Sequence, residues 1–114
     1  MEIIINNNLF NVKCVMTRKD IEKGMMFKKF DDTYDGMLFF MKDKPHSFWM
    51  KNCIIPLDII FIKSNTIDKI HHNCKPCLTD DCEHYPGEGD MVLEILGGSC
   101  KEYDIQEGDR VYFN

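Results

Sequence analysis

Apolar and polar residues follow each other along this chain in short runs, and such a pattern is typical of a protein built mainly from β-strands. The runs are separated by glycine, proline, asparagine and aspartate, which favour turns. The pattern predicts strands over residues 9–16, 37–41, 48–52, 57–62, 66–72, 91–96 and 110–113. We therefore expect a sheet of about six to seven short strands.

Two of these strands are expected to form the centre of the sheet. Residues 48–52 and 57–62 are strongly apolar, and a connection of four residues between them would make a hairpin. In that register Lys51 lies opposite Asp58, and the two side chains would form a cross-strand ion pair. A shift of one residue would turn every side chain to the other face, so this pairing tests the register.

One helix is predicted over residues 18–27. Thr17 is suited to the N-cap position, and Asp20 three residues later resembles a capping box. Helical spacing would place Met25 on the core side. Gly24 lies inside the predicted helix, where glycine costs about 1 kcal/mol relative to alanine, so we expect it to allow a neighbour to approach closely.

These elements predict one domain over residues 1–114. A chain of 114 residues buries about two thirds of its extended surface, which is enough for a core of its own. A long cysteine-rich loop is expected over residues 73–89, and loops of this length are usually functional or crosslinked. The expected class is α+β and mostly β, a small barrel-like or sandwich sheet with one packed helix in the N-terminal half.

Charge and hydropathy exclude several classes of partner. The net charge is −5, whereas a nucleic-acid footprint needs a surplus of lysine and arginine, so we expect no nucleic-acid partner. No apolar run is long enough to span a membrane, and the start of the chain does not resemble a signal peptide, so we expect no membrane partner and a cytoplasmic location. Twelve lysines, two arginines and no alanine are typical of an AT-rich genome, which suggests a viral or low-GC source.

Short motifs are spread over nearly the whole chain: Ser47–Asn52 with Ile55–Phe61, Gly24–Met26, Gly36–Phe39, Leu93–Glu94 with Gly97–Gly98, and Ile105 with Gly108–Asp109. With these motifs the chain resembles the uncharacterised family called domain of unknown function 192. The resemblance implies the fold of that family and no particular activity. Cys53 stands where the family usually has threonine and Lys28 where it usually has arginine, so no arginine-based role is expected at position 28.

Three of the six cysteines fall within nine residues of the long loop. Cys74, Cys77 and Cys82, with His84 or His72, could supply the four ligands of a structural zinc site. The spacing between the last cysteine and His84 is tight for such a site. Zinc is the one cofactor that this pattern suggests, and it would make the domain a zinc-stabilised interaction module.

The family resemblance offers a second interpretation of the same loop. Cys77 and Cys82 are similar to a cysteine pair that many relatives carry there, and those relatives are often secreted, where such a pair would form a disulfide. The four residues between them leave room for the bridge. A cytosolic chain would keep both thiols reduced, so free thiols in a mobile loop are the third interpretation.

A ligand pocket is predicted around Trp49, Lys51, Asn52 and Asp58. A carboxylate in an apolar strand, such as Asp58, has a raised pKa unless a cation or donor compensates, and such groups concentrate at functional sites. The plainer interpretation is that Asp58 pairs with Lys51 or accepts backbone N–H groups, and so only fixes the register.

Glu94 lies in an apolar strand and shares a face with Val92 and Leu96, so it is a second candidate for an inward carboxylate. Asp58 and Glu94 could together act as the acid and base of a hydrolase. The chain lacks a nucleophile elbow, a phosphate loop and a dinucleotide fingerprint. We therefore expect a non-catalytic binding or accessory module for a small molecule or an extended peptide, with the hydrolase and the zinc module as alternatives.

Overall fold

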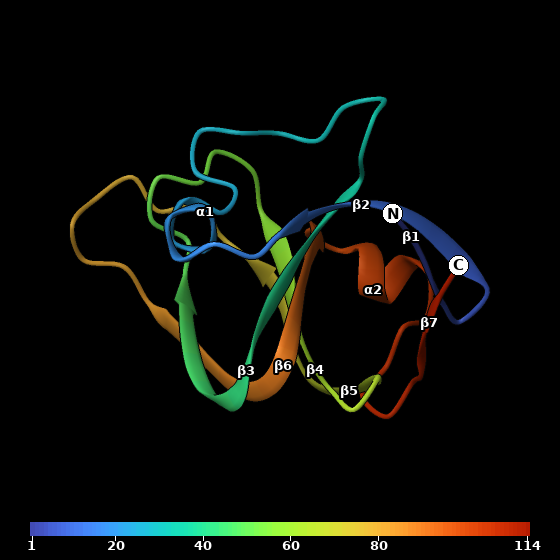
Figure 1. The fold of residues 1–114 in the computed structure, drawn as a ribbon. Helices are drawn as coiled ribbons and strands as arrows, with labels where there is room; N and C mark the ends of the chain where they lie inside the picture. The colour runs from blue at the N-terminus through green and yellow to red at the C-terminus, as the bar shows by residue number, and fades with distance from the viewer.

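The computed structural model describes residues 1–114, which form seven strands and two short helices (Figure 1). The strands are β1 (Glu2–Ile5), β2 (Asn8–Val15), β3 (Gly36–Trp49), β4 (Leu57–Lys63), β5 (Thr66–Cys74), β6 (His84–Leu96) and β7 (Val111–Phe113). The helices are α1 (Arg18–Lys23) and α2 (Ser99–Glu102). The prediction of a mostly β domain of the α+β class is confirmed.

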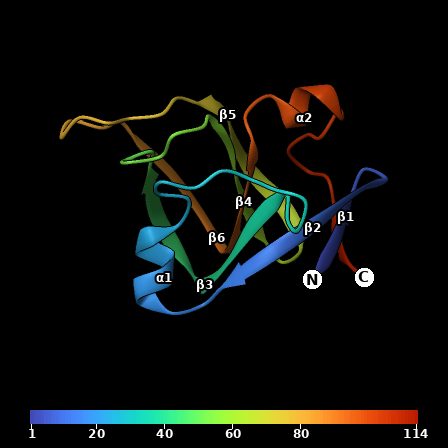
Figure 2. The ribbon, with the colours of Figure 1, turned by 90° about the horizontal axis from the view of Figure 1, so that it is seen from above.

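All seven strands belong to one curled sheet, in the order β5-β4-β6-β3-β2-β1-β7. Its two edges come together, because the N–H of Ile67 donates to the carbonyl of Asp109, and the N–H of Val111 donates to the carbonyl of Asn65, both at 2.8 Å. The two helices lie on opposite sides of the sheet (Figure 2). Neither helix is long and apolar enough to cross a membrane.

The predicted central hairpin is wrong. Strand β3 pairs with β6, with Trp49 opposite His84, and β4 lies between β5 and β6. The reason is visible in β4, where every residue except the last is buried. A continuous apolar run of this kind is typical of a central strand covered on both faces, rather than of one arm of a hairpin.

Strands β3 and β6 are much longer than their patterns predict. The predicted strands 37–41 and 48–52 are largely one strand, β3, which continues through a register irregularity between Phe40 and Lys44. Strand β6 includes Pro86, Gly87 and Gly89, which predicted a loop. Only residues 75–83 of the expected loop 73–89 are irregular.

Helix α1 begins where predicted and ends four residues early. The Oγ1 of Thr17 accepts a hydrogen bond from the N–H of Asp20 at 3.2 Å, which confirms the N-cap. Gly24 is the C-cap, with φ +45°, so it ends the helix instead of lying inside it. Met25 is buried as predicted, but in the turn that follows the helix.

The sheet separates two apolar clusters. The inner cluster fills the curl and contains Leu38, Ile60, Leu93 and Ile95 together with Cys100 of α2. The outer cluster lies on the other face, beneath α1 and the loops that surround it, and its members include Met25, Met37, Phe39, Met50, Cys53, Ile59, Phe61 and Val92. Because neighbouring residues of a strand point to opposite faces, each central strand contributes to both clusters.

Candidate functional site

A cavity of about 460 Å³ lies on the outer face, between α1 with the turn that follows it and the C-terminal end of β3. Its wall is mainly apolar and is formed by Ile21, Met25, Met26, Phe39, Phe48, Trp49 and Cys53. Five residues with polar side chains also line it, namely Glu22, Lys23, Ser47, Lys51 and Glu94. An apolar cavity with few polar groups is the usual form of a small-molecule site.

Glu94 is the buried polar group of this cavity. It lies on the central strand β6, opposite Met37 of β3 and Ile59 of β4, and only 4% of its surface is exposed. None of the side-chain hydrogen bonds or ion pairs of the structure involves its carboxyl group, and burial raises its pKa to about 8. The carboxyl group is therefore mostly neutral at pH 7, with its hydrogen-bonding capacity unused by the protein.

This carboxyl group should make the fold less stable as the pH rises. The pKa of Glu94 is about 8 in the folded chain against its ordinary value of 4.5, so the folded chain holds a proton that the unfolded chain releases. Stability falls with pH wherever the folded state binds more protons, at up to about 1.4 kcal/mol per pH unit. When the pH is raised from 5.5 to 7.0, we expect the unfolding free energy of the wild type to fall by about 2 kcal/mol more than that of Glu94→Gln.

Urea unfolding of the wild type and of Glu94→Gln at several pH values measures this effect. The difference between the two proteins isolates Glu94 from the other carboxyl groups. Parallel curves for the two proteins across this pH range would show that Glu94 ionises normally in the folded state.

Trp49 lies at the edge of the cavity, as the predicted pocket requires. It is 42% exposed, and its ring lies 5.8 Å from the ring of His84, centroid to centroid. The adjacent Phe48 packs edge-on against Phe39 at 5.2 Å and Phe61 at 5.7 Å. The end of β3 thus presents aromatic surface both to the core and to the cavity.

Lys51 also lines the cavity, but its predicted partner is wrong. Its ammonium group donates to the carbonyl of Thr79 and to the Oδ1 of Asp80, at 2.8 Å from the latter. The hydrogen bond from Lys51 lowers the pKa of Asp80. Asp58 takes no part, because β4 does not pair with the segment that carries Lys51.

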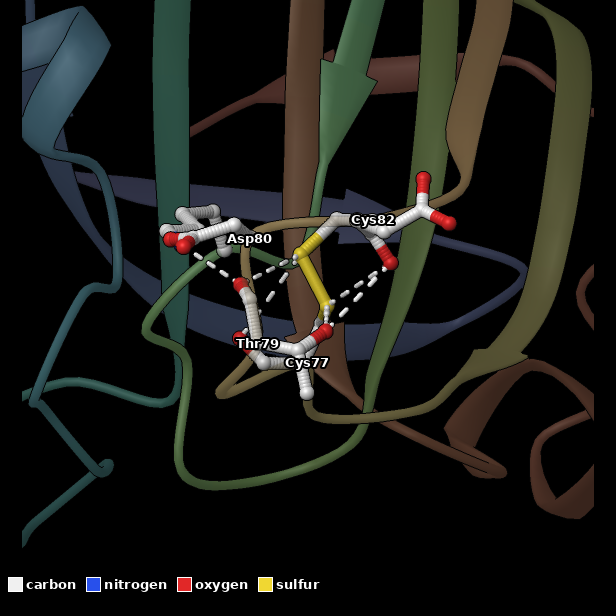
Figure 3. A network of polar contacts seen from close by, with 6 residues as sticks. Cys77, Thr79, Asp80 and Cys82 are labelled. Atoms are coloured by element: carbon white, nitrogen blue, oxygen red, sulfur yellow. Dashed lines mark hydrogen bonds and ion pairs between the residues drawn. A yellow bond between two sulfur atoms is a disulfide. The ribbon is translucent and has the colours of Figure 1, made fainter.

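Thr79 and Asp80, which accept the hydrogen bonds of Lys51, lie in a loop closed by a disulfide between Cys77 and Cys82, whose sulfur atoms lie 2.02 Å apart (Figure 3). Two backbone hydrogen bonds fasten this loop to the residues on either side of Lys51: the N–H of Asn52 donates to the carbonyl of Cys77, and the N–H of Cys77 donates to the carbonyl of Met50. Asn52 itself adopts φ +60° and does not line the cavity. It acts through its backbone, as a turn residue.

The structure does not bring the four predicted zinc ligands together. Cys77 and Cys82 bond to each other, and Cys74 is buried in the outer cluster, where burial raises the pKa of its thiol to about 12. The Nδ1 of His84 faces the hydroxyl of Ser47 at 3.3 Å. His72, the alternative ligand, lies in another cluster, with Asp58 and Cys100.

Asp58 is completely buried and has a structural position. Its Oδ1 accepts hydrogen bonds from the N–H groups of Asn73 at 2.7 Å and Gly98 at 3.1 Å, and its Oδ2 accepts one from the N–H of Cys100 at 2.8 Å. These bonds tie β4 to the end of β5 and to the start of α2.

Asp58 and Glu94 do not face one cavity. In the register of β4 and β6, Asp58 lies opposite Ile95 and Ile59 lies opposite Glu94. Directly opposite residues share a face, so the two carboxyl groups lie on different faces of the sheet. The arrangement therefore lacks the acid and base pair that a hydrolase using these two residues needs.

The cavity contains Trp49 and Lys51 of the predicted pocket and Glu94 of the predicted hydrolase pair, but most of its wall was not predicted. The turn Gly24–Met26 was placed inside a helix, whereas it forms one side of the cavity. Gly24–Met26 is one of the motifs that resemble the family, and this motif was the signal in the sequence that could have pointed to the cavity wall. Lys28, where the family usually has arginine, donates to the carbonyl of Gly24 at 3.2 Å and does not line the cavity.

Comparison with known proteins gives a consistent result. The family model described as "Uncharacterized ACR", domain of unknown function 192, matches residues 1–113. A crystal structure of a protein of unknown function from Novosphingobium aromaticivorans DSM 12444 is similar with a TM-score of 0.87 and 30% identity, over 98% of this chain and 84% of that chain. No curated protein matches the chain.

A second similar crystal structure is that of a protein from Sinorhizobium meliloti 1021, described as a "putative transcription regulator". The TM-score is 0.80 with 30% identity, over 96% of this chain and 88% of that chain. Both similarities extend over nearly the whole of the sheet, and neither description states a ligand.

Proposed function

We propose a function for this chain, which belongs to the domain of unknown function 192 family, from its cavity, because the family has no described activity. The proposed function is that of a non-catalytic binding module for a small apolar molecule that carries an amine. The single observation behind this proposal is the carboxyl group of Glu94, which lines an apolar cavity and has no partner within the protein. The same chemistry would also suit the amine of a peptide side chain.

The choice of an amine follows from the state of the carboxyl group. Folding has already removed Glu94 from water, so a ligand does not have to provide that energy again. When an alkylammonium ion enters, Glu94 releases its proton to the solvent, and the two charges pair in a site of low dielectric constant. A carboxylate ligand could not form this ion pair, and its negative charge would oppose the ionisation of Glu94.

The residues at the edge of the cavity also favour an amine as the ligand. Trp49 and Phe48 line the cavity, and the faces of aromatic rings attract cations. Lys51 is held by Asp80 and Thr79, so it does not compete for Glu94. Binding without catalysis is favoured because the second candidate carboxyl group, Asp58, faces the other side of the sheet.

The test compares n-hexylamine, n-hexanol and n-hexanoate, three probes that share one apolar chain. Fluorescence of Trp49, the only tryptophan, should report binding at the cavity edge. We expect the amine to bind most tightly and the carboxylate most weakly. Affinity for the amine should also rise between pH 6.5 and 8, because the proton of Glu94 must leave.

Matched variants separate the carboxyl group from general packing. Glu94→Gln should weaken hexylamine binding by about 10-fold or more and leave hexanol nearly unchanged, since a hydrogen bond to a charged group contributes about 1.5–3 kcal/mol. Glu88→Gln, a change at an exposed carboxylate, should alter neither. Equal binding of the three probes, or a preference for the amine that survives Glu94→Gln, would refute the proposal.

Trp49→Ala tests the edge of the cavity. Because Trp49 is 42% exposed, the substitution should leave the fold intact. Binding of the amine and the alcohol should weaken together, since both lose the same apolar wall, and this is measured by NMR chemical shifts in place of fluorescence. If only the affinity for the amine falls, Trp49 contributes to binding of the cation rather than of the apolar chain.

A further inference from the structure

A second group of chemically reactive side chains lies on the inner face of the sheet, away from the cavity of Glu94. Asp58 of β4, His72 of β5 and Cys100 of α2 each place one donor atom within 4.8 Å of the other two. The three residues are far apart in the sequence, and the packing of α2 against the inner cluster brings them together. We propose that they bind one divalent metal ion of the zinc class.

The donor set fits that class of ion. Zinc accepts thiolate, imidazole and carboxylate ligands together, at about 2.0–2.3 Å from the metal. Tetrahedral ligands at such bond lengths lie roughly 3.5 Å from each other. The donor atoms lie within 4.8 Å of one another, so they must approach by up to about 1.3 Å to bind one ion, and the exposed side chain of His72 can supply this movement.

Asp58 is oriented as a metal ligand would be. Three backbone N–H groups hold its carboxylate, two at Oδ1 and one at Oδ2. Each carboxylate oxygen can accept two bonds, and the thiol of Cys100, which hydrogen-bonds to the carboxyl group of Asp58, would give up this bond with its proton when a metal ion binds. Hydrogen bonds of this kind fix the direction of ligands in known metal sites.

The charges also balance. Binding converts the thiol of Cys100 to a thiolate bonded to the metal and releases its proton to the solvent. One thiolate, the carboxylate of Asp58 and a neutral imidazole then neutralise a divalent ion. This arrangement leaves no net charge in the apolar surroundings of Cys100, which include Ile70 and Ile105.

The site is open on one side. A cavity of about 630 Å³ is lined by His72 and Cys100, together with Lys101, Asp104, Gln106 and Glu107. Glu107 is partly engaged, because its Oε2 accepts a hydrogen bond from the N–H of Ile70 at 3.0 Å. A water molecule from this cavity can fill the fourth position, so three protein ligands and one exchangeable site are expected.

Cobalt(II) is the probe, because it occupies zinc sites and its thiolate bond absorbs light. The full chain is stripped of metal with a chelator and titrated without reductant, so that Cys77 and Cys82 stay bonded to each other and cannot bind the ion. We expect one cobalt per chain, a thiolate charge-transfer band, and the intense visible bands of a four-coordinate ion. Zinc should displace the cobalt and remove the bands.

Variants identify the ligands. Cys100→Ser should abolish the charge-transfer band, whereas Cys14→Ser, at a half-buried free cysteine, should retain it. His72→Asn should weaken binding at least 10-fold, and His46→Asn should not. Because His72 is exposed, its substitution leaves a test even if Cys100→Ser fails to fold. Absence of the band in the wild type, or a band unaffected by His72→Asn, would overturn the proposal.

Discussion

Replacing Asp58 with Asn is expected to destabilise the protein by about 3–5 kcal/mol, because hydrogen bonds to a charged group contribute about 1.5–3 kcal/mol and a buried donor left without a partner costs about 1–3 kcal/mol. The carboxylate accepts three backbone hydrogen bonds, and an amide has only one oxygen to accept them. The NH₂ group of the new amide would face at least one of these three backbone N–H groups, and that buried N–H group would lose its hydrogen-bond partner. The ties from β4 to β5 and α2 should weaken together.

Glu94→Gln is the matched control, because it makes the same chemical change at the other buried carboxyl group. Glu94 accepts no hydrogen bond from the protein and is mostly neutral at pH 7, so we expect this substitution to be neutral or stabilising there. Urea unfolding at pH 7 compares the two. Equal losses of stability would mean that the backbone donors around Asp58 contribute little, and our account of that residue would be wrong.

Gly89→Ala should have an effect of similar size, about 4 kcal/mol or more, through a different mechanism. Gly89 has φ +155°, and an added Cβ would lie 2.2 Å from the carbonyl oxygen of Ile62 and 2.8 Å from its carbonyl carbon. Both atoms belong to the backbone of β4, whose pairing with β6 ends at Ile62 opposite Met91, two residues from Gly89. The clash can be relieved only by separating two central strands, so strain and lost hydrogen bonds add.

Gly108→Ala separates the clash from backbone conformation. Gly108 also has a positive φ, +95°, but an added Cβ would meet nothing within 4 Å. Its substitution should cost only about 1–2 kcal/mol, the price of the left-handed conformation. The two variants are compared by their urea midpoints, with the slope as a check on the unfolded state. Similar midpoints would show that β6 can move away from β4 at Gly89.

Local features of the fold were predictable because they depend on neighbouring residues. The Thr17 N-cap, the turn at Ser64–Asn65 and the apolar run of β4 follow from short stretches of sequence. The turn at Asn6–Asn7 was missed, although both residues have positive φ, as two-residue hairpin turns require. Its signal was present in the asparagines, but the strand before it was too short to recognise.

Strand pairing was not predictable, since it depends on residues distant in the sequence. Residues 36–49 pair with residues 84–96, and no local pattern states this. The prediction of a hairpin chose the nearest apolar run as the partner. The same choice produced the wrong ion pair for Lys51, whose partner Asp80 lies in the disulfide loop.

The candidate site was found in part. Of the four residues of the predicted pocket, Trp49 and Lys51 line the cavity, whereas Asn52 and Asp58 do not. Asp58 and Glu94 were both recognised as buried carboxyl groups. Which of them faces the cavity depends on the register of β4 against β6, and that information appears only in the folded structure.

The pairing of strands that are distant in the sequence has a consequence for folding kinetics. Strand β7 pairs with β1, so residues 111–113 must find residues 3–5, and β3 must find β6 across the whole of β4 and β5. Such a sheet has a high contact order, and proteins of this kind fold in milliseconds to seconds rather than microseconds. The β4–β5 hairpin is the longer of the two local hairpins, and we expect refolding to begin there and to finish when the ends of the chain pair.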